Sequence, residues 1–147
     1  MTAVADGNPL LGTWKLKSYV VTAGTGEKST PYGEHPTGYL SYAADGRMQA
    51  MGTSSGRIVP RGPAMTDEER IALYETMFAY AGTYSLEPGK VTHHVDTSWN
   101  EIWNDTHQVR FFELHGSILV LMSRLVDPAS GREARYVVTW EKVTSPL

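Results

Sequence analysis

Two adjacent histidines, His93 and His94, are the residues of this chain best suited to acid–base chemistry. They follow a Pro88-Gly89 pair, and the residues on both sides of that pair alternate as in a β-hairpin. Neighbouring residues of a strand point to opposite faces of a sheet, so only one imidazole can face the interior. Histidine titrates near neutral pH, which makes the inward one a candidate for proton transfer.

Pairing across a two-residue Pro88-Gly89 turn decides which histidine faces inward. It places Tyr84 opposite His93 and leaves His94 on the polar face of the hairpin. The apolar face carries Leu86, Tyr84, Val91, His93 and Val95. Because the apolar face is the one a sheet buries, we expect His93 to lie inside, beside Tyr84, and His94 to lie outside.

Two interpretations of His93 remain open from the residues alone. Burial favours the neutral imidazole, which suits a general base, while Tyr84, Tyr42 or Arg110 could polarise a carbonyl or stabilise an oxyanion. Alternatively, His93 is a core histidine whose ring nitrogens are satisfied by Tyr84 and a water molecule. On the first interpretation, the candidate catalytic residues are His93, Tyr84 and Arg110.

Short strands must position these residues. The stretch from Leu11 to Val20 alternates for most of its length, and a second hairpin turns at Asp45-Gly46. Three strand pairs finish the chain, and they turn at Pro88-Gly89, at His115-Gly116 and within 127–131. About eight strands with hairpin-like connections predict an all-β, antiparallel barrel or sandwich.

One helix is expected, over about residues 66–80. Thr66 and Glu69 have the spacing of a capping box. Apolar residues then follow at helical spacing, namely Ile71, Tyr74, Met77, Phe78 and Ala81. We expect this amphipathic helix to cover one opening of the barrel or to pack on its wall.

Chain length, net charge and cysteine content limit the classes of function to consider. A chain of 147 residues suits one domain, which we place at 11–147 after a polar leader at 1–10. The net charge of -3 gives no reason to expect binding to nucleic acid or to an anionic membrane. There is no apolar run of about 18 residues and no evident signal peptide, so we expect a cytoplasmic protein. The absence of cysteine excludes disulfides and thiolate chemistry.

No metal or cofactor site is expected. His93 and His94 cannot chelate one ion from a regular strand, and the other histidines, His35, His107 and His115, lie in separate loops or turns. The sequence contains no serine nucleophile elbow, no phosphate-binding glycine loop, and no flavin or nicotinamide fingerprint.

Several short motifs resemble one known family in their order and spacing. They are Leu11-Gly12-Thr13-Trp14, Pro36-Thr37-Gly38-Tyr39-Leu40, Tyr80-Ala81-Gly82-Thr83-Tyr84, Val91-Thr92-His93-His94-Val95 and Thr139-Trp140-Glu141-Lys142-Val143. From about Leu11 to Val143 the chain is similar to the small lipocalin-like domain family. The resemblance implies a calycin-type barrel with a central cavity for a small, largely apolar molecule. It also implies that Trp14 plugs the closed end.

The resemblance also guides the choice of ligand-binding residues. On the His115-Gly116 hairpin both faces are apolar, and by resemblance we expect the one bearing Leu119 and Leu121 to face inward. Arg110 would then enter the barrel and favour an anionic or carbonyl-bearing ligand, although an outward, solvated Arg110 stays open. The expected ligand-binding residues are Trp14, Leu40, Tyr42, Trp99, Trp103, Phe112, Leu119 and Leu121. Trp99 and Trp103 form either the rim of the barrel mouth or a satellite cluster.

The combined hypothesis is a monomeric or homodimeric barrel that binds a small hydrophobic molecule. Family members in natural-product pathways resemble cyclases or isomerases, so we expect a cofactor-independent isomerase, cyclase or lyase in which His93 shuttles a proton. The alternatives are a non-catalytic carrier or sensor, or a barrel that its own side chains fill.

Overall fold

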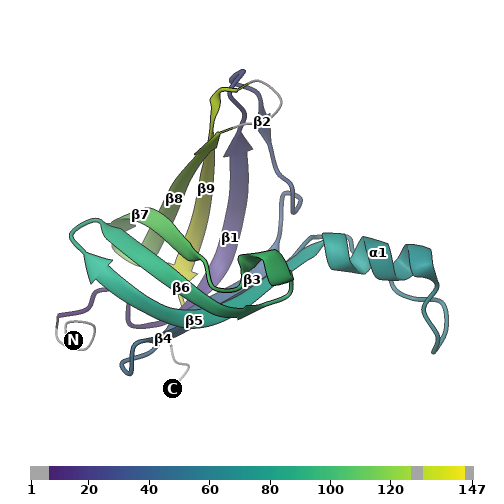
Figure 1. The fold of residues 1–147 in the computed structure, drawn as a ribbon, viewed down its shortest axis with the longest axis horizontal. Coiled ribbons are helices and arrows are strands. Elements are labelled where there is room, and N and C mark those ends of the chain that lie inside the picture. The colour runs from purple at the N-terminus through teal and green to yellow at the C-terminus, as the bar shows by residue number, and fades with distance from the viewer. Residues whose placement is uncertain (1–6, 127–130, 145–147) are drawn as a thin grey trace.

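Strands dominate the fold (Figure 1). A computed structural model describes residues 7–126 and 131–144. The strands are β1 (Gly12–Thr22), β2 (Lys28–Ser29), β3 (Thr37–Tyr42), β4 (Arg47–Thr53), β5 (Met77–Glu87), β6 (Lys90–Ser98), β7 (His107–His115), β8 (Ile118–Val126) and β9 (Glu133–Lys142). The helices are α1 (Asp67–Glu75) and a single 3-10 turn, η1 (Glu101–Trp103). The predicted last turn, at 127–131, falls largely outside the described residues.

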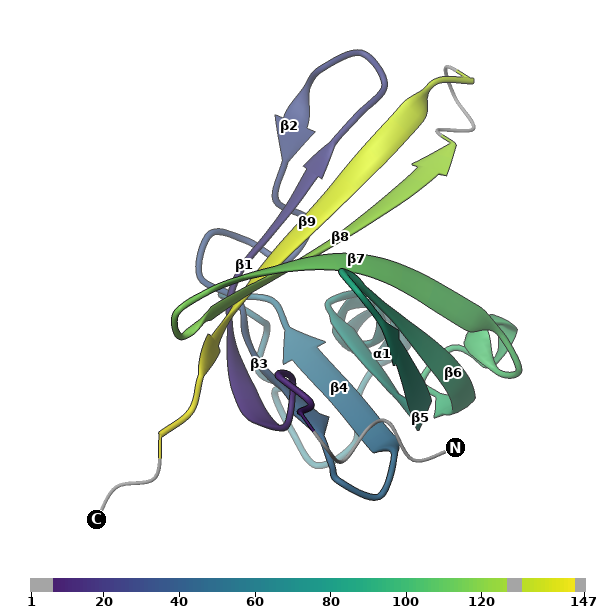
Figure 2. The same ribbon diagram turned by 90° about the vertical axis from the view of Figure 1, so that its left-hand side faces the viewer.

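Eight of the strands close into an antiparallel barrel. Each strand from β3 to β8 pairs with the next, and β1 closes the barrel by pairing with both β3 and β9. The short β2 only adds an edge to the far end of β1. Figure 2 shows β1, β8 and β9 extending beyond the rest of the barrel at that end. The prediction of an all-β, antiparallel barrel of about eight strands is confirmed.

Trp14 belongs to the hydrophobic core at what we call the closed end of the barrel. Trp14 is 2% exposed, and its indole Nε1 donates a hydrogen bond to the carbonyl of Leu10 at 2.9 Å. Lys142 lies over the indole ring and donates to the carbonyl of Leu11 at 2.6 Å. Leu10 is itself fully buried, so the chain packs against the barrel just before the predicted domain boundary at residue 11.

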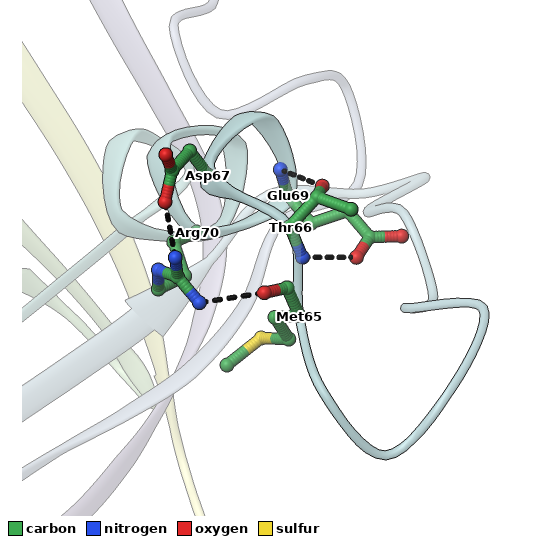
Figure 3. Close-up of polar contacts among 5 residues, drawn as sticks. All are labelled: Met65, Thr66, Asp67, Glu69 and Arg70. Atoms are coloured by element: carbon green, nitrogen blue, oxygen red, sulfur yellow. Dashed lines mark hydrogen bonds and ion pairs between the residues drawn. The ribbon is translucent and has the colours of Figure 1, made fainter.

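The helix is shorter than the sequence pattern predicts, and it does not cover the barrel. The capping box is present, because Thr66 accepts from the backbone N–H of Glu69 and Glu69 accepts from that of Thr66 (Figure 3). The helix ends at Glu75, however, and the rest of the predicted range 66–80 begins β5. None of its residues is buried, and it points away from the barrel (Figure 1).

The early end of α1 has a physical reason. From Met77 onward the residues also alternate, with Phe78 on one face and Ala79 on the other. Phe78 pairs with Gly52 of β4, and its ring fills the space that a side chain at residue 52 would need. The pairing with β4 satisfies the backbone and buries Phe78, which a helical continuation would leave exposed.

No helix among the described residues is long and apolar enough to span a membrane.

Candidate functional site in the barrel interior

The β5–β6 hairpin has the register predicted from its turn. Tyr84 pairs with His93, and Gly82 pairs with Val95. His93 is 0% exposed inside the barrel, whereas His94 lies on the outer face. A bulge follows at Ala81/Gly82, and a side chain at Gly82 would collide with the backbone carbonyl of His94. Glycine at this position therefore lets the two strands approach next to His93.

Two tyrosine hydroxyls hold the ring of His93. Its Nε2 lies 2.6 Å from the hydroxyl of Tyr42, and its Nδ1 lies 2.9 Å from the hydroxyl of Tyr80. The expectation that Tyr84 and a water molecule would satisfy His93 is therefore wrong. The Tyr84 hydroxyl donates to the carbonyl of Ala43 and accepts from the side-chain amide of Asn8, both at 2.8 Å. Only its ring reaches the cluster, where it packs on Tyr42.

The Tyr42–His93–Tyr80 cluster has one more proton than its two hydrogen bonds use. A neutral imidazole has one N–H donor and one acceptor nitrogen, and each hydroxyl contributes one further proton. The shorter distance, to Tyr42, fits an O–H donor, and the longer one, to Tyr80, fits an N–H donor. With this assignment Tyr42 donates to His93 and His93 donates to Tyr80. The hydroxyl proton of Tyr80 is then available for another acceptor.

The cluster keeps its protons and stays uncharged at neutral pH. Burial, reinforced by the nearby positive charge of Arg110, lowers the pKa of His93 to about 3. Burial also raises the pKa of Tyr42 well above its ordinary value. The pKa of Tyr80 is raised by burial too, although Arg110 acts in the opposite direction. The three groups are therefore hydrogen-bonding neutral side chains, and none is a strong base.

Arg110 enters the barrel, as the family resemblance led us to expect. It pairs with Val91 across β6 and β7, and Val91 is 0% exposed on the interior face. One guanidinium nitrogen, Nη1, donates to the carbonyl of Val109 at 3.0 Å. Its charge influences Tyr42, Tyr80 and His93 together. Arg110 thus adds a cation to the otherwise neutral cluster.

The tryptophans of the β6–β7 connection extend the site. Trp103 packs against Tyr80 with the ring centroids 5.3 Å apart, and Trp99 packs against Trp103 at 5.4 Å. Both tryptophans are half-buried. The predicted loop aromatics therefore adjoin the polar cluster, and their role in ligand binding stays a prediction.

The remaining predicted ligand-binding residues belong mainly to the core. Trp14, Leu40, Leu119 and Leu121 are at most 4% exposed, and Phe112 packs against this core while partly buried. Of the eight, Tyr42 is the one that contacts His93 through a hydrogen bond. The structure thus joins Tyr42, His93 and Arg110, and it directs the hydroxyl of Tyr84 elsewhere.

The sequence pattern missed two residues of the site. The helical pattern includes Tyr80, although the alternation of Phe78, Tyr80, Gly82 and Tyr84 also fits one face of a strand, and Tyr80 lies in β5. Gln108 pairs with His93 in the β6–β7 register, and its side-chain amide donates to Thr106 Oγ1 at 2.7 Å. That register depends on a connection of irregular length, which the sequence does not specify.

The outer histidine also has partners. Nδ1 of His94 lies 2.7 Å from Nδ1 of His107, and Nε2 of His94 lies 2.9 Å from the hydroxyl of Ser85. This chain of contacts is on the outside of the barrel and is separate from the His93 cluster.

Within residues 7–126 and 131–144, no three His, Asp or Glu side chains gather in a way that could hold a metal ion.

A closed, eight-stranded antiparallel barrel fits the lipocalin-like class of protein. A family model described as a lipocalin-like domain matches residues 11–143. The chain therefore belongs to the lipocalin-like domain family. No curated protein and no solved structure gave a match to the chain.

Proposed function

We propose that the barrel binds a small, largely hydrophobic molecule that carries a carbonyl or carboxylate oxygen. The observation that carries this proposal is the Tyr42–His93–Tyr80 cluster, which leaves one hydroxyl proton free beside a guanidinium. An oxygen atom of the ligand would accept from Tyr80 and lie close to Arg110. The aromatic rings of Trp103 and Trp99 would contact the apolar part.

This arrangement supports cofactor-independent isomerase, cyclase or lyase chemistry. Hydrogen-bond donors that are already in place stabilise the negative charge that develops on a carbonyl oxygen, and one donor contributes about 10²–10³ in rate. Tyr80 and Arg110 are such donors. His93 is fully buried, so we assign it a positioning role: it orients the hydroxyl of Tyr80 and does not touch the ligand.

One observation favours the second candidate, a non-catalytic carrier or sensor. A pKa of about 3 makes His93 a weak base, and its burial keeps it from the ligand. The same donors would hold a ligand oxygen without any reaction. A cytoplasmic location and a place in natural-product biosynthesis stay predictions from the sequence and its resemblance.

The deciding experiment starts from the purified protein. Native mass spectrometry identifies a co-purifying small molecule, which is then incubated with the protein in D2O. Conversion of the molecule, or uptake of deuterium at a carbon next to its carbonyl, supports the enzyme. Recovery of an unlabelled, intact molecule supports the carrier. A ligand without any carbonyl or carboxylate oxygen contradicts both.

Tyr80→Phe and Tyr84→Phe form a matched pair, since each removes one hydroxyl from the same strand face. We expect Tyr80→Phe to lower turnover by about 10²-fold, or for a carrier to weaken binding by about tenfold, and Tyr84→Phe to change neither. The anionic dye 8-anilinonaphthalene-1-sulfonate serves as a binding probe for Arg110→Met. His93→Gln tests positioning, because it should lower turnover without abolishing dye binding. Equal effects of the two tyrosine variants would contradict the site.

A further inference from the structure

A bulge in β1 turns one further tyrosine into the barrel. The β1–β9 register shifts between Leu16 and Ser18, so β1 has one residue more than its partner strand at this point. Simple alternation from the inward Leu16 would direct Ser18 inward. After the bulge it is Tyr19 that pairs with Val138, which packs on the core from the interior face of β9. The bulge thus re-aims the side chain of Tyr19 toward the interior.

Tyr19 belongs to an aromatic group at the end of the barrel away from the closed end. Its ring centroid lies 4.9 Å from that of Tyr32, 5.9 Å from that of Phe78 and 6.4 Å from that of Tyr136. Burial raises the pKa of Tyr19, so the hydroxyl keeps its proton at neutral pH. Within the residues that the structure describes, no hydrogen bond satisfies this hydroxyl. Tyr19 therefore has a proton to donate.

Arg110 is the charge that Tyr19 shares with the His93 cluster. Burial raises the pKa values of Tyr19, Tyr42 and Tyr80, and in each case the charge of Arg110 acts in the opposite direction. Tyr80 also acts on the pKa of Tyr19, so the two hydroxyls lie near one another. In the described part of the chain, no carboxylate forms an ion pair with Arg110. A half-buried cation without a counter-ion is costly, and a ligand that brings a negative charge removes this cost.

We propose that the ligand of the barrel is a hydrophobic carboxylate, with one oxygen on the hydroxyl of Tyr80 and the other on the hydroxyl of Tyr19. This inference rests on the proposed function and narrows the ligand oxygen named there to that of a carboxylate. The two oxygens of a carboxylate accept several hydrogen bonds, and Arg110 balances its charge through donors that its contact with Val109 leaves unused. A neutral carbonyl compound would leave that charge unbalanced.

Two probes with the same ring test this inference on the full chain. 2-Naphthoate carries a carboxylate at neutral pH, whereas methyl 2-naphthoate keeps the ring and a carbonyl but has no charge. The fluorescence of the naphthyl ring measures the dissociation constant of each probe. We expect the carboxylate to bind about tenfold more tightly than the ester, although the ester is the more hydrophobic probe.

Tyr19→Phe and Tyr136→Phe form a matched pair, because each removes one hydroxyl from the same aromatic group. Tyr19→Phe should weaken binding of the carboxylate about tenfold and leave the ester unchanged, and Tyr136→Phe should change neither. Arg110→Met should make the two probes bind about equally, and Arg110→Lys should restore part of the preference because it restores the charge. A structural effect alone would weaken both probes alike. Circular dichroism shows whether each variant keeps the strands.

The possible failures separate this inference from the proposed function. If the ester binds as tightly as the carboxylate, while Tyr80→Phe still weakens binding more than Tyr84→Phe does, the carboxylate is wrong and the proposed function stands. A preference for the carboxylate that persists in both Tyr19→Phe and Arg110→Met would also overturn the inference, since the anion would then lie elsewhere. Failure of both probes to bind at millimolar concentration would contradict the inference and the proposed function together.

Discussion

Tyr80 and Tyr84 lie on the same face of the same strand, four residues apart, yet their hydroxyls do different things. Tyr84 donates to the carbonyl of Ala43 and accepts from Asn8, so its hydroxyl bonds entirely within the closed end. The hydroxyl of Tyr80 bonds to Nδ1 of His93 and interacts with the side chain of Arg110, and in the assignment above it keeps a proton to donate. The first tyrosine completes a packed end of the barrel, and the second is the one that we propose to contact a ligand.

The difference extends to the two regions around them. At the closed end, polar groups of Trp14, Lys142 and Tyr84 bond to backbone carbonyls, which satisfies them without a ligand. Around Tyr80, the side chains of Arg110, Trp99 and Trp103 are only half-buried. Stability and binding are thus expected to depend on different residues.

The largest expected effect is on the closed end. Trp14→Ala should lower the free energy of unfolding by about 3–5 kcal/mol, because it removes a buried indole and leaves a cavity. Trp103→Ala, at the half-buried site, is the matched control and should cost clearly less. Urea unfolding followed by circular dichroism measures both. If the two substitutions destabilise equally, the division into a structural end and a binding end fails.

An intermediate effect is expected from pH. The pKa of His93 falls from 6.5 to about 3 on folding, so between these values the unfolded chain binds a proton that the folded barrel does not. Stability from this residue is therefore complete above pH 6.5 and decreases as the pH falls toward 3, by at most about 1.4 kcal/mol per pH unit.

Urea unfolding across this range, with His93→Gln for comparison, measures the contribution of the histidine. The variant lacks the titrating group and should show a shallower loss of stability on acidification. Identical slopes for the two proteins would mean that His93 is not held neutral by burial.

The smallest effect separates the two tyrosines directly. Tyr84→Phe removes the hydroxyl that bonds to the carbonyl of Ala43 and to the amide of Asn8, and it should cost about 1–2 kcal/mol. Tyr80→Phe removes a hydroxyl with a spare proton at a half-buried position and should cost less. Thermal unfolding of the two variants side by side resolves the difference. A larger loss for Tyr80→Phe would reverse the comparison.

The turn residues and the alternation of side chains were enough to predict the barrel and the opposite orientations of His93 and His94. Both depend on local rules, since a two-residue turn sets the register and the register sets the face. The end of α1 was not predictable in the same way. Met77 to Ala81 fit a helical and a strand pattern equally, and only pairing with β4 selected the strand.

The partners of His93 also required the tertiary structure. Tyr42 belongs to β3, which is not a neighbour of β6 in the sheet, and it reaches the imidazole across the barrel interior. By itself, therefore, the sequence determined that one histidine is buried and the other is not. Closure of the barrel decided that Tyr42 and Tyr80, and not Tyr84, hold that histidine, because distances across an interior depend on every strand that encloses it.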